Sequence, residues 1–206
     1  MKLVGTEALV TGANRGLGKS IVKALAEAGT SRIYAGARTR FQPPDYGPQS
    51  TILPLDLDIT DPAQVTRAAS SASGTTLLIN NAGMLPRGGA MSVSEQDLQA
   101  AMEVNLIGTW RMIRAFAPVI KANGGGVIVN ILSMISFQNT APFAAYSAAK
   151  HASWDITQSF QNDLAGSGVR IVACFPGGID TDMLRGVPAI KASPDSVAQS
   201  LSLIHI

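Results

Sequence analysis

The stretch Thr11-Gly12-Ala13-Asn14-Arg15-Gly16-Leu17-Gly18 decides the fold, because it joins a short apolar run, Glu7–Thr11, to a segment with helical periodicity. In that segment apolar residues recur at helical spacing from Leu17 until Gly29. Glycines at a strand-to-helix turn let backbone amides approach a pyrophosphate, and the helix N-terminus adds positive potential. The alternative is a tight turn that needs glycine only for its dihedral angles. Placement in the first β-α turn favours a dinucleotide site, with contacts from Gly12, Asn14, Arg15, Gly16, Leu17 and Gly18.

Short apolar runs recur along the chain, separated by segments that mostly have helical periodicity. Runs that are apolar on both faces and are joined by long crossovers are typical of a parallel sheet with helices on each side. We therefore predict one doubly wound, Rossmann-like α/β domain over residues 1–206. The crossover from Thr39 to Ser50 holds three prolines, which predict a loop instead of a helix. The expected strands are 7–11, 32–35, 51–57, 76–80, 126–132 and 169–175.

Composition narrows the possible partners of the chain. Only 15% of the 206 residues are charged, the net charge is +2, and the basic residues form no run, so no nucleic-acid partner is expected. The longest apolar stretch, Gly126 to Phe137, is too short for a bilayer, and no signal peptide is evident, so we expect a cytoplasmic protein without membrane insertion. The low charge predicts apolar surface covered in a homo-oligomer, a dimer or tetramer. The lone Cys174 is expected to pack inertly, and no metal site is predicted.

The residues after the second expected strand indicate which nicotinamide cofactor is preferred. Arg38 stands where an acidic residue would hold a ribose hydroxyl, and no Asp or Glu occurs between Glu27 and Asp45. An arginine can bind a 2′-phosphate through charge-assisted hydrogen bonds, so NADP(H) is predicted over NAD(H), with Arg15 as a second clamp. Asp58, after the third expected strand, is either an acceptor for the adenine amino group or a turn aspartate, and these alternatives are evenly matched.

Tyr146-Ser-Ala-Ala-Lys150 places a phenol and an ammonium on one face of a helix. Lowering a tyrosine pKa from ~10 to about 7 requires roughly 4 kcal/mol, which a unit charge ~4 Å away supplies at an effective dielectric of ~20. Lys150 could therefore make Tyr146 an acid near neutral pH. Such a pair is also common on ordinary helices, so the pair alone is weak evidence. Ser133, at the end of an apolar strand, strengthens the interpretation.

Two asparagine features add to the predicted site. Ser92 with Glu95 predicts a capping box, and the helix that it opens carries Asn105 on its apolar stripe. A buried amide is either locked to backbone groups or holds an ordered water, and spacing alone favours the first. Asn80-Asn81-Ala82-Gly83 ends the fourth expected strand, where a cofactor crevice opens, although a strand-ending turn would explain it as well. The expected cofactor contacts here are Asn81, Ala82 and Gly83.

Taken together, these motifs resemble the short-chain dehydrogenase/reductase family, in the branch with T-G-x-x-x-G-x-G. The similarity extends from Leu9 to about Met183. Each motif is weak alone, but their ordered set is specific. The motifs are Thr11 to Gly18, Asn80 to Gly83, Asn105, Ser133, Tyr146 with Lys150, and Pro176-Gly177-Gly178-Ile179-Asp180-Thr181.

The resemblance implies a role for each site residue. Tyr146 would donate the proton to a substrate carbonyl, and Lys150 would lower the tyrosine pKa and bind the nicotinamide ribose. Ser133 would hydrogen-bond the carbonyl oxygen, and Asn105 would hold a water that links Lys150 to solvent. The nicotinamide end of the cofactor would touch Pro176, Gly177, Ile179 and Thr181.

The expected function is NADP(H)-dependent interconversion of a carbonyl and a secondary alcohol on a small substrate. Members of the family usually continue through another helix and a seventh strand, whereas here Ser193-Pro194-Asp195 starts a helical segment and the sequence stops at Ile206. A missing seventh strand, a truncated reading frame and a doubtful tail from about residue 192 are therefore expected. A non-catalytic NADP(H)-binding protein or an inactive fragment is the main alternative, and sugar epimerisation or dehydration ranks below it. His151 and His205 have no predicted role.

Overall fold

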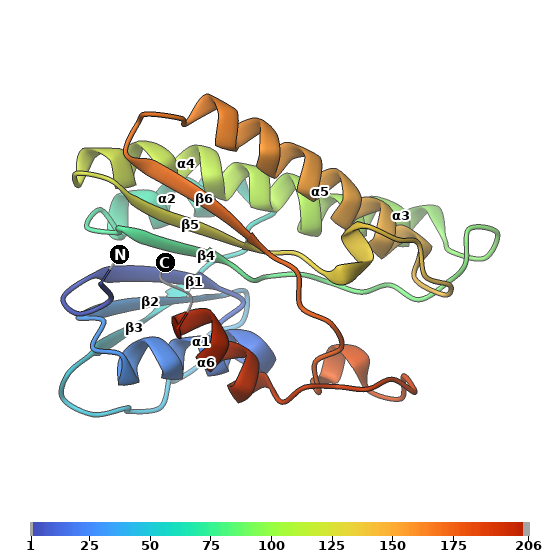
Figure 1. Ribbon diagram of the computed structural model, residues 1–206, viewed down its shortest axis with the longest axis horizontal. Coiled ribbons are helices and arrows are strands. Elements are labelled where there is room, and N and C mark those ends of the chain that lie inside the picture. The colour runs from blue at the N-terminus through green and yellow to red at the C-terminus, as the bar shows by residue number, and fades with distance from the viewer. Residues whose placement is uncertain (1, 204–206) are drawn as a thin grey trace.

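The computed structural model describes residues 2–203 and contains a six-stranded parallel sheet in the order β3-β2-β1-β4-β5-β6 (Figure 1). The side chains of the inner strands are mostly buried on both faces, whereas those of the edge strand β3 are partly or fully exposed. The predicted doubly wound α/β fold is confirmed, and the strands begin and end close to the expected residues. They are β1 (Glu7–Thr11), β2 (Arg32–Ala37), β3 (Thr51–Asp56), β4 (Leu77–Asn80), β5 (Gly126–Ile131) and β6 (Val169–Cys174).

The order of the strands reverses at β1, which pairs with β2 on one side and with β4 on the other. Leu9 of β1, for example, is in register with Tyr34 of β2 and Leu78 of β4. The connections from these two sides of β1 diverge, so a crevice opens at the carboxyl ends of the strands. This is where the fold places the loops that carry the predicted motifs.

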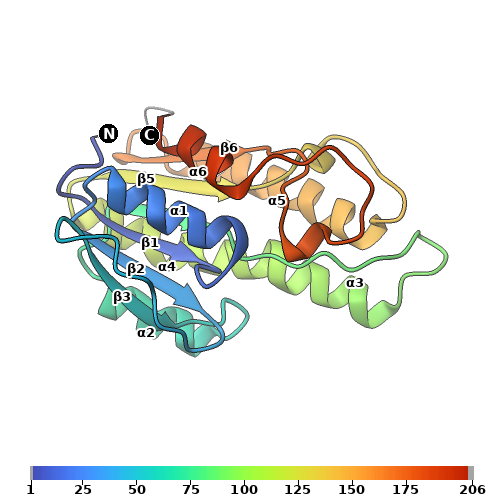
Figure 2. The same ribbon diagram turned by 90° about the horizontal axis from the view of Figure 1, so that it is seen from below.

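Helices cover both faces of the sheet. α1 (Gly16–Glu27) and α6 (Pro194–Leu203) lie together on one face, which Figure 2 shows in front of the strands. α2 (Pro62–Ser71), α4 (Thr109–Ala122) and α5 (Ala144–Asp163) cover the other face. Each face has its own apolar core, and the full burial of large side chains such as Phe116 stabilises the fold by about 1.5–3 kcal/mol each.

The segments without regular structure also follow from the sequence. Residues 39–50 contain no helix, as their prolines predict. The helical segment predicted to start near Ser193 is α6, and Cys174 packs partly buried against the core, where burial raises the pKa of its thiol. None of the helices within residues 2–203 has the length and apolar character that crossing a bilayer requires. His205 lies outside the described residues, whereas the His151 ring contacts the Ser147 carbonyl.

The predicted capping box of Ser92 with Glu95 is wrong. Ser94 is the N-cap of α3 (Glu95–Met102), and its hydroxyl accepts a hydrogen bond of 3.0 Å from the Asp97 N–H. The Ser92 hydroxyl instead accepts from the Gly89 N–H, so it closes the preceding turn. The sequence holds two overlapping serine-to-acid spacings, and the extended backbone at Ser94 selects the second one.

The helix expected to run without interruption from this cap contains a π-helical segment, η1 (Glu103–Gly108), between α3 and α4. Leu98, which helical spacing places on the same apolar stripe as Asn105, is 39% exposed and therefore lies off the buried face. The segment ends at Gly108, where a Cβ atom would lie 2.7 Å from the Ile59 side chain. The close approach of these two elements therefore requires glycine, and η1 brings Asn105 into the interior.

Candidate active site

The glycine turn between β1 and α1 is shaped to admit an anion. Gly12 and Gly16 have positive φ angles of 66° and 51°, which favour glycine. A Cβ atom on Gly18 would lie only 2.1 Å from the Gly12 carbonyl oxygen, so α1 can pack against the turn only without a side chain there. Arg15 is the N-cap of α1 and makes no side-chain cap hydrogen bond, which leaves the first N–H groups of the helix for a ligand. The cradle fits the diphosphate of a dinucleotide.

Residues after β4 hold this turn in place. The Thr11 hydroxyl accepts hydrogen bonds of 2.9 Å from the N–H groups of both Asn81 and Ala82. The Asn81 amide donates to the carbonyls of Thr11 (2.9 Å) and Gly12 (3.3 Å). Gly83 packs so closely against Asn105 that a Cβ atom on Gly83 would lie 2.9 Å from the Asn105 Oδ1 atom. The structure thus brings the two motifs together through structural contacts, and their contact with a cofactor stays a prediction.

The residues predicted to bind the adenosine end follow the carboxyl ends of β1, β2 and β3. Arg38 is exposed directly after β2, and the Arg15 guanidinium lies 3.8 Å from the Asp182 carboxylate. The Asp58 Oδ1 atom accepts hydrogen bonds from the Thr60 N–H (2.9 Å) and hydroxyl (2.7 Å). Asp58 therefore makes the turn before α2, as one of the two alternatives has it, and an adenine contact remains a prediction.

Ser133, Tyr146 and Lys150 are brought together at the carboxyl end of β5. Ser133 follows β5, whereas Tyr146 and Lys150 lie near the start of α5, which packs against the Ser133 loop. The Ser133 side chain lies close enough to the Tyr146 phenol to lower its pKa, and the Ser133 hydroxyl accepts a hydrogen bond of 3.3 Å from the Ile135 N–H. The Lys150 Nζ atom donates to the Ile131 carbonyl at 2.8 Å and lies 5.7 Å from the centre of the Tyr146 ring.

Burial controls the ionisation of this pair. Tyr146 is 8% exposed and Lys150 5%. Burial raises the pKa of Tyr146 to about 12, with a smaller lowering from the Ser133 hydrogen bond, and burial lowers the pKa of Lys150 to about 8. The expected lowering of the tyrosine pKa is therefore not seen, because the ammonium is bound to the Ile131 carbonyl and loss of solvent outweighs it. At neutral pH the phenol keeps its proton and the amine is mostly charged.

Asn105 is locked to backbone groups. The residue is only 1% exposed. Its side-chain NH₂ group donates hydrogen bonds to the carbonyls of Met84 (2.9 Å) and Ala101 (3.1 Å), and its side-chain oxygen accepts one from the Met84 N–H (3.2 Å). Its own carbonyl accepts a hydrogen bond of 2.9 Å from the Ser153 hydroxyl. The side chain thus fixes the loop after β4 to η1, as spacing alone favoured, and the water-holding role stays a prediction.

The segment after β6 contacts both the Ser133 loop and the glycine turn. The Pro176 carbonyl accepts a hydrogen bond of 3.1 Å from the Met134 N–H, which attaches the segment to the Ser133 loop. Gly177 faces the Met134 sulfur, and Ile179 forms an isolated bridge with Ala192. A Cβ atom on Gly16 would lie 3.2 Å from the Thr181 methyl group, so the same segment also reaches the glycine turn.

Sequence reasoning missed a buried polar chain below the site. The Asn80 amide donates to the Asn130 oxygen (2.8 Å), and the Asn130 amide donates to the Thr157 hydroxyl (2.9 Å). Thr157 donates to the Ser153 carbonyl (2.6 Å), one turn earlier in α5. The available signal was Asn130, a polar residue inside an otherwise apolar strand, which must find partners when buried. The chain joins β4 and β5 to α5 and thereby fixes the helix that carries Tyr146.

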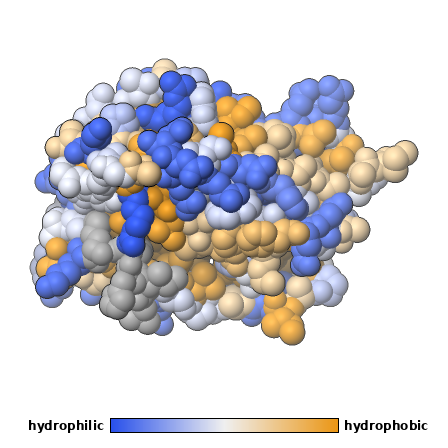
Figure 3. Space-filling view, turned by 45° about the horizontal axis from the view of Figure 1, so that its top comes forward, coloured by the Kyte–Doolittle hydropathy of each residue, from blue (hydrophilic) through white to orange (hydrophobic). Residues whose placement is uncertain are grey.

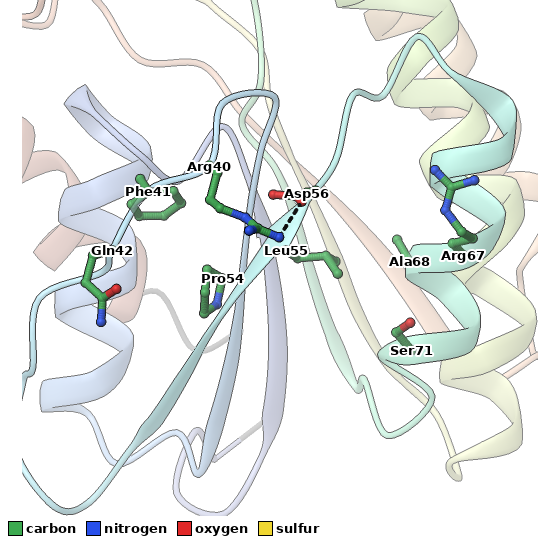
Figure 4. Close-up of a pocket in the computed structure, with 9 residues that line it drawn as sticks. All are labelled: Arg40, Phe41, Gln42, Pro54, Leu55, Asp56, Arg67, Ala68 and Ser71. Atoms are coloured by element: carbon green, nitrogen blue, oxygen red, sulfur yellow. Dashed lines mark hydrogen bonds and ion pairs between the residues drawn. The ribbon is translucent and has the colours of Figure 1, made fainter.

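A surface hollow of about 610 Å³ lies away from these residues, at the β3 edge of the sheet (Figure 4). Arg40 and Asp56 form an ion pair of 3.3 Å on its wall, and Figure 4 shows Arg67 and Ser71 facing it from α2. None of Ser133, Tyr146 and Lys150 lines it. The active site is therefore identified by its side chains and not by this hollow.

Known proteins match the chain over most of its length. A family model described as short chain dehydrogenase matches residues 6–191. A 2-dehydro-3-deoxy-D-gluconate 5-dehydrogenase of Bacillus subtilis is 34% identical, over 87% of this chain and 73% of that protein. A short chain dehydrogenase of Aspergillus terreus is 32% identical over 92% of this chain, which spans 44% of the length of that protein. A crystal structure of a short chain dehydrogenase from Burkholderia cenocepacia in complex with NADP has a TM-score of 0.92 at 40% identity, with 98% of this chain and 84% of that chain covered.

The fold, the site and these matches define an NAD(P)-dependent oxidoreductase that acts on CH–OH or C=O groups. The chain belongs to the short chain dehydrogenase family, as its ordered motifs predict.

Proposed function

We propose that this protein is an NADP(H)-dependent oxidoreductase that interconverts a carbonyl and a secondary alcohol on a small substrate, with Tyr146 as the general acid and base. The observation that carries the proposal is that the buried Tyr146 phenol lies beside the part-buried Ser133 side chain, which lowers its pKa, and beside the Lys150 ammonium, 5.7 Å from the centre of the ring. A phenol that stays protonated at neutral pH is suited to donate a proton to a carbonyl oxygen.

The side chains of the site divide the work of reduction. Bound NADPH would supply the hydride to the carbonyl carbon. The Tyr146 phenol donates its proton to the carbonyl oxygen, while the Ser133 hydroxyl donates a hydrogen bond that holds that oxygen in place. The phenolate left on Tyr146 is stabilised by the charged Lys150 until a proton returns from solvent. Oxidation of the alcohol follows the same steps in reverse.

The cofactor would lie along the crevice from the glycine turn to Tyr146. The cradle of Gly12, Gly16 and Gly18 would hold the diphosphate, since side chains there would fill the space. Arg38 and Arg15 would bind the 2′-phosphate by charge-assisted hydrogen bonds, which supports a preference for NADP(H).

For the rest of the cofactor, we propose the same contact residues as those predicted from the sequence. The residues proposed to line it further along the crevice are Asn14, Leu17, Asp58, Asn81, Ala82, Gly83, Lys150, Pro176, Gly177, Ile179 and Thr181, with Asn105 as a holder of water.

Replacing Tyr146 with phenylalanine tests the proposed acid. Removal of a general acid lowers turnover by about 10²- to 10⁴-fold, whereas the affinity for NADPH should change by less than about 2-fold. Tyr34→Phe is a matched control, because Tyr34 is 7% exposed and its hydroxyl contacts Glu7, a residue outside the proposed site. Turnover of a ketone and aldehyde panel by the Tyr146 variant at the rate of the wild type would refute the assignment. Wild-type protein that binds NADPH without any turnover would favour the non-catalytic alternative.

Arg38→Asp tests the cofactor preference. The substitution should weaken NADPH binding by about 10-fold or more, because loss of charge-assisted hydrogen bonds costs about 1.5–3 kcal/mol. NADH binding should stay the same or become tighter, because an acidic residue at this position can accept a hydrogen bond from a ribose hydroxyl. Affinities for both nucleotides are measured by titration of their fluorescence. An unchanged ratio of the two affinities would contradict the phosphate-binding role.

Assembly and location complete the proposal. Met134, Phe137 and Met183 are 54%, 60% and 40% exposed, and Figure 3 shows hydrophobic residues gathered between hydrophilic areas on one face. Exposed apolar side chains of this kind support a homo-oligomer, for which we propose a cytoplasmic location. Light scattering after size exclusion that finds only monomers, or fractionation that finds the protein in membranes, would contradict these parts.

A further inference from the structure

The proposed phosphate clamp Arg15 already has an acidic partner. Its guanidinium lies 3.8 Å from the carboxylate of Asp182, which belongs to the short helix η3 (Asp182–Leu184) after β6. Asp182 also pairs with Arg185, three residues later. Both side chains of the first pair are more than half exposed, so a ligand could reach Arg15 while Asp182 remains beside it.

The backbone around Asp182 is held at this position by other contacts. Thr181 packs against the glycine turn, where its methyl group would lie 3.2 Å from a Cβ atom on Gly16. On the opposite side of the segment, Arg87 donates to the Arg185 carbonyl, and Lys191 donates to the Leu184 carbonyl at 2.9 Å. The carboxylate therefore stays near Arg15 because the segment is anchored on both sides.

We propose that Asp182 sets the affinity for the phosphorylated cofactor by competing with its 2′-phosphate for Arg15. The inference rests on the proposed function, in which Arg15 contacts that phosphate. An arginine bound to a carboxylate must release or share it to bind a phosphate of charge near −2, and the two anions then repel each other. NADH lacks the 2′-phosphate, so the presence of Asp182 costs it little.

Arg185 moderates this competition, because it shares the Asp182 carboxylate. By linkage, binding of the 2′-phosphate weakens the contact between Arg15 and Asp182 by the same factor by which Asp182 weakens binding of the phosphate. With Asp182 present, the protein would therefore prefer the phosphorylated cofactor less strongly than the two arginines alone would make it. Asp182 would also couple occupation of the phosphate site to the segment after β6.

The test compares dissociation constants of NADPH and NADH for wild type, Asp182→Asn and a matched control. Asp195→Asn is the control, because Asp195 is also exposed and lies 3.6 Å from a cation, Lys23, outside the proposed site. Since exposed ion pairs contribute little, Asp182→Asn should bind NADPH about 2- to 5-fold more tightly, with NADH affinity unchanged. The gain should disappear in an Arg15→Gln background, and Asp195→Asn should behave as wild type.

Three results would overturn the inference. Asp182→Asn could bind NADPH with the affinity of wild type, it could gain as much affinity for NADH as for NADPH, or it could keep its gain in NADPH affinity in the Arg15→Gln background. Wild-type protein that binds neither nucleotide would instead refute the proposed function. A wild type that prefers NADPH, with Asp182→Asn and Asp195→Asn indistinguishable, would refute only the role of Asp182.

Discussion

Replacing Lys150 with methionine tests how much stability the protein loses by burying an ammonium group. Burial lowers the pKa of Lys150 from 10.5 to about 8. A difference of this size corresponds to roughly 3 kcal/mol of destabilisation while the group is charged in both the folded and unfolded states. The methionine side chain has a similar length without charge, but it leaves the Ile131 carbonyl without its 2.8 Å hydrogen bond, which costs about 1–3 kcal/mol. The variant should therefore be up to about 2 kcal/mol more stable than wild type at neutral pH, and it should have no measurable turnover.

The pH dependence gives the sharper test. Below pH ~8 Lys150 is protonated in both the folded and the unfolded protein, so the free-energy cost of burying its charge is constant. Between pH ~8 and ~10.5 the unfolded protein binds more protons than the folded protein, so the free energy of unfolding of the wild type rises with pH. The rise relative to Lys150→Met should be about 1 kcal/mol between pH ~8 and ~9. The difference between wild type and variant removes the pH dependence that other titrating groups contribute to both proteins. Tyr146 is one of these groups, and its raised pKa lowers the free energy of unfolding only as the pH rises above its unfolded pKa of 10.0.

Urea denaturation at a series of pH values measures both quantities, and Lys121→Met, at an exposed position of α4, is the control for loss of a lysine charge. A free energy of unfolding that has the same pH dependence in wild type and Lys150→Met would show that the folded Lys150 titrates normally. The argument from burial would then be wrong.

Three further outcomes follow from the site. Reductive turnover should fall as the pH rises through about 8, where Lys150 loses its charge, and a pH-rate profile that stays flat across this value would contradict it. Gly18→Ala should destabilise the protein by about 3 kcal/mol or more and abolish NADPH binding, because its Cβ atom would lie 2.1 Å from the Gly12 carbonyl oxygen; calorimetry and titration check this, and wild-type affinity would refute it. Thr11→Val removes the acceptor of two 2.9 Å hydrogen bonds and should cost about 1–3 kcal/mol in urea denaturation, whereas a change near zero would show that the turn does not depend on them.

Features set by local sequence were predictable. The inner strands are runs that are apolar on both faces, and a strand of this kind needs no knowledge of its neighbours to be recognised. The glycine turn was predictable for a similar reason, since its positive φ angles and the close approach of Gly18 restrict the residues that can occupy it. Tyr146 and Lys150 share a helix face by spacing alone.

Features set by the surroundings were not predictable. The direction of the Tyr146 pKa shift depends on how completely the phenol is buried and on the carbonyl that receives the Lys150 amine, and neither follows from the spacing of the two residues. The π-helical segment around Asn105 ends at Gly108, which packs against Ile59, and the spacing of residues along the helix does not reveal this contact between distant parts of the sequence. Both Ser92 and Ser94 have an acidic residue three positions later, so the sequence does not show which of them caps the helix; the backbone dihedral angles of the folded protein select Ser94.

The order of the strands explains why these separate motifs form one site. β4 lies between β1 and β5, so the turn that follows β1 and the Ser133 loop that follows β5 open at the same edge of the sheet, one strand apart. Asn81, which follows β4, fixes the first of them, and the Asn80 to Asn130 hydrogen bond fixes the second relative to β4. A diphosphate bound at the glycine turn would therefore extend its nicotinamide toward Tyr146 across a single, rigid strand end. Because parallel neighbours cannot slip without exposing their buried faces, the distance between the glycine turn and Tyr146 is set by the sheet and not by the loops at its edge.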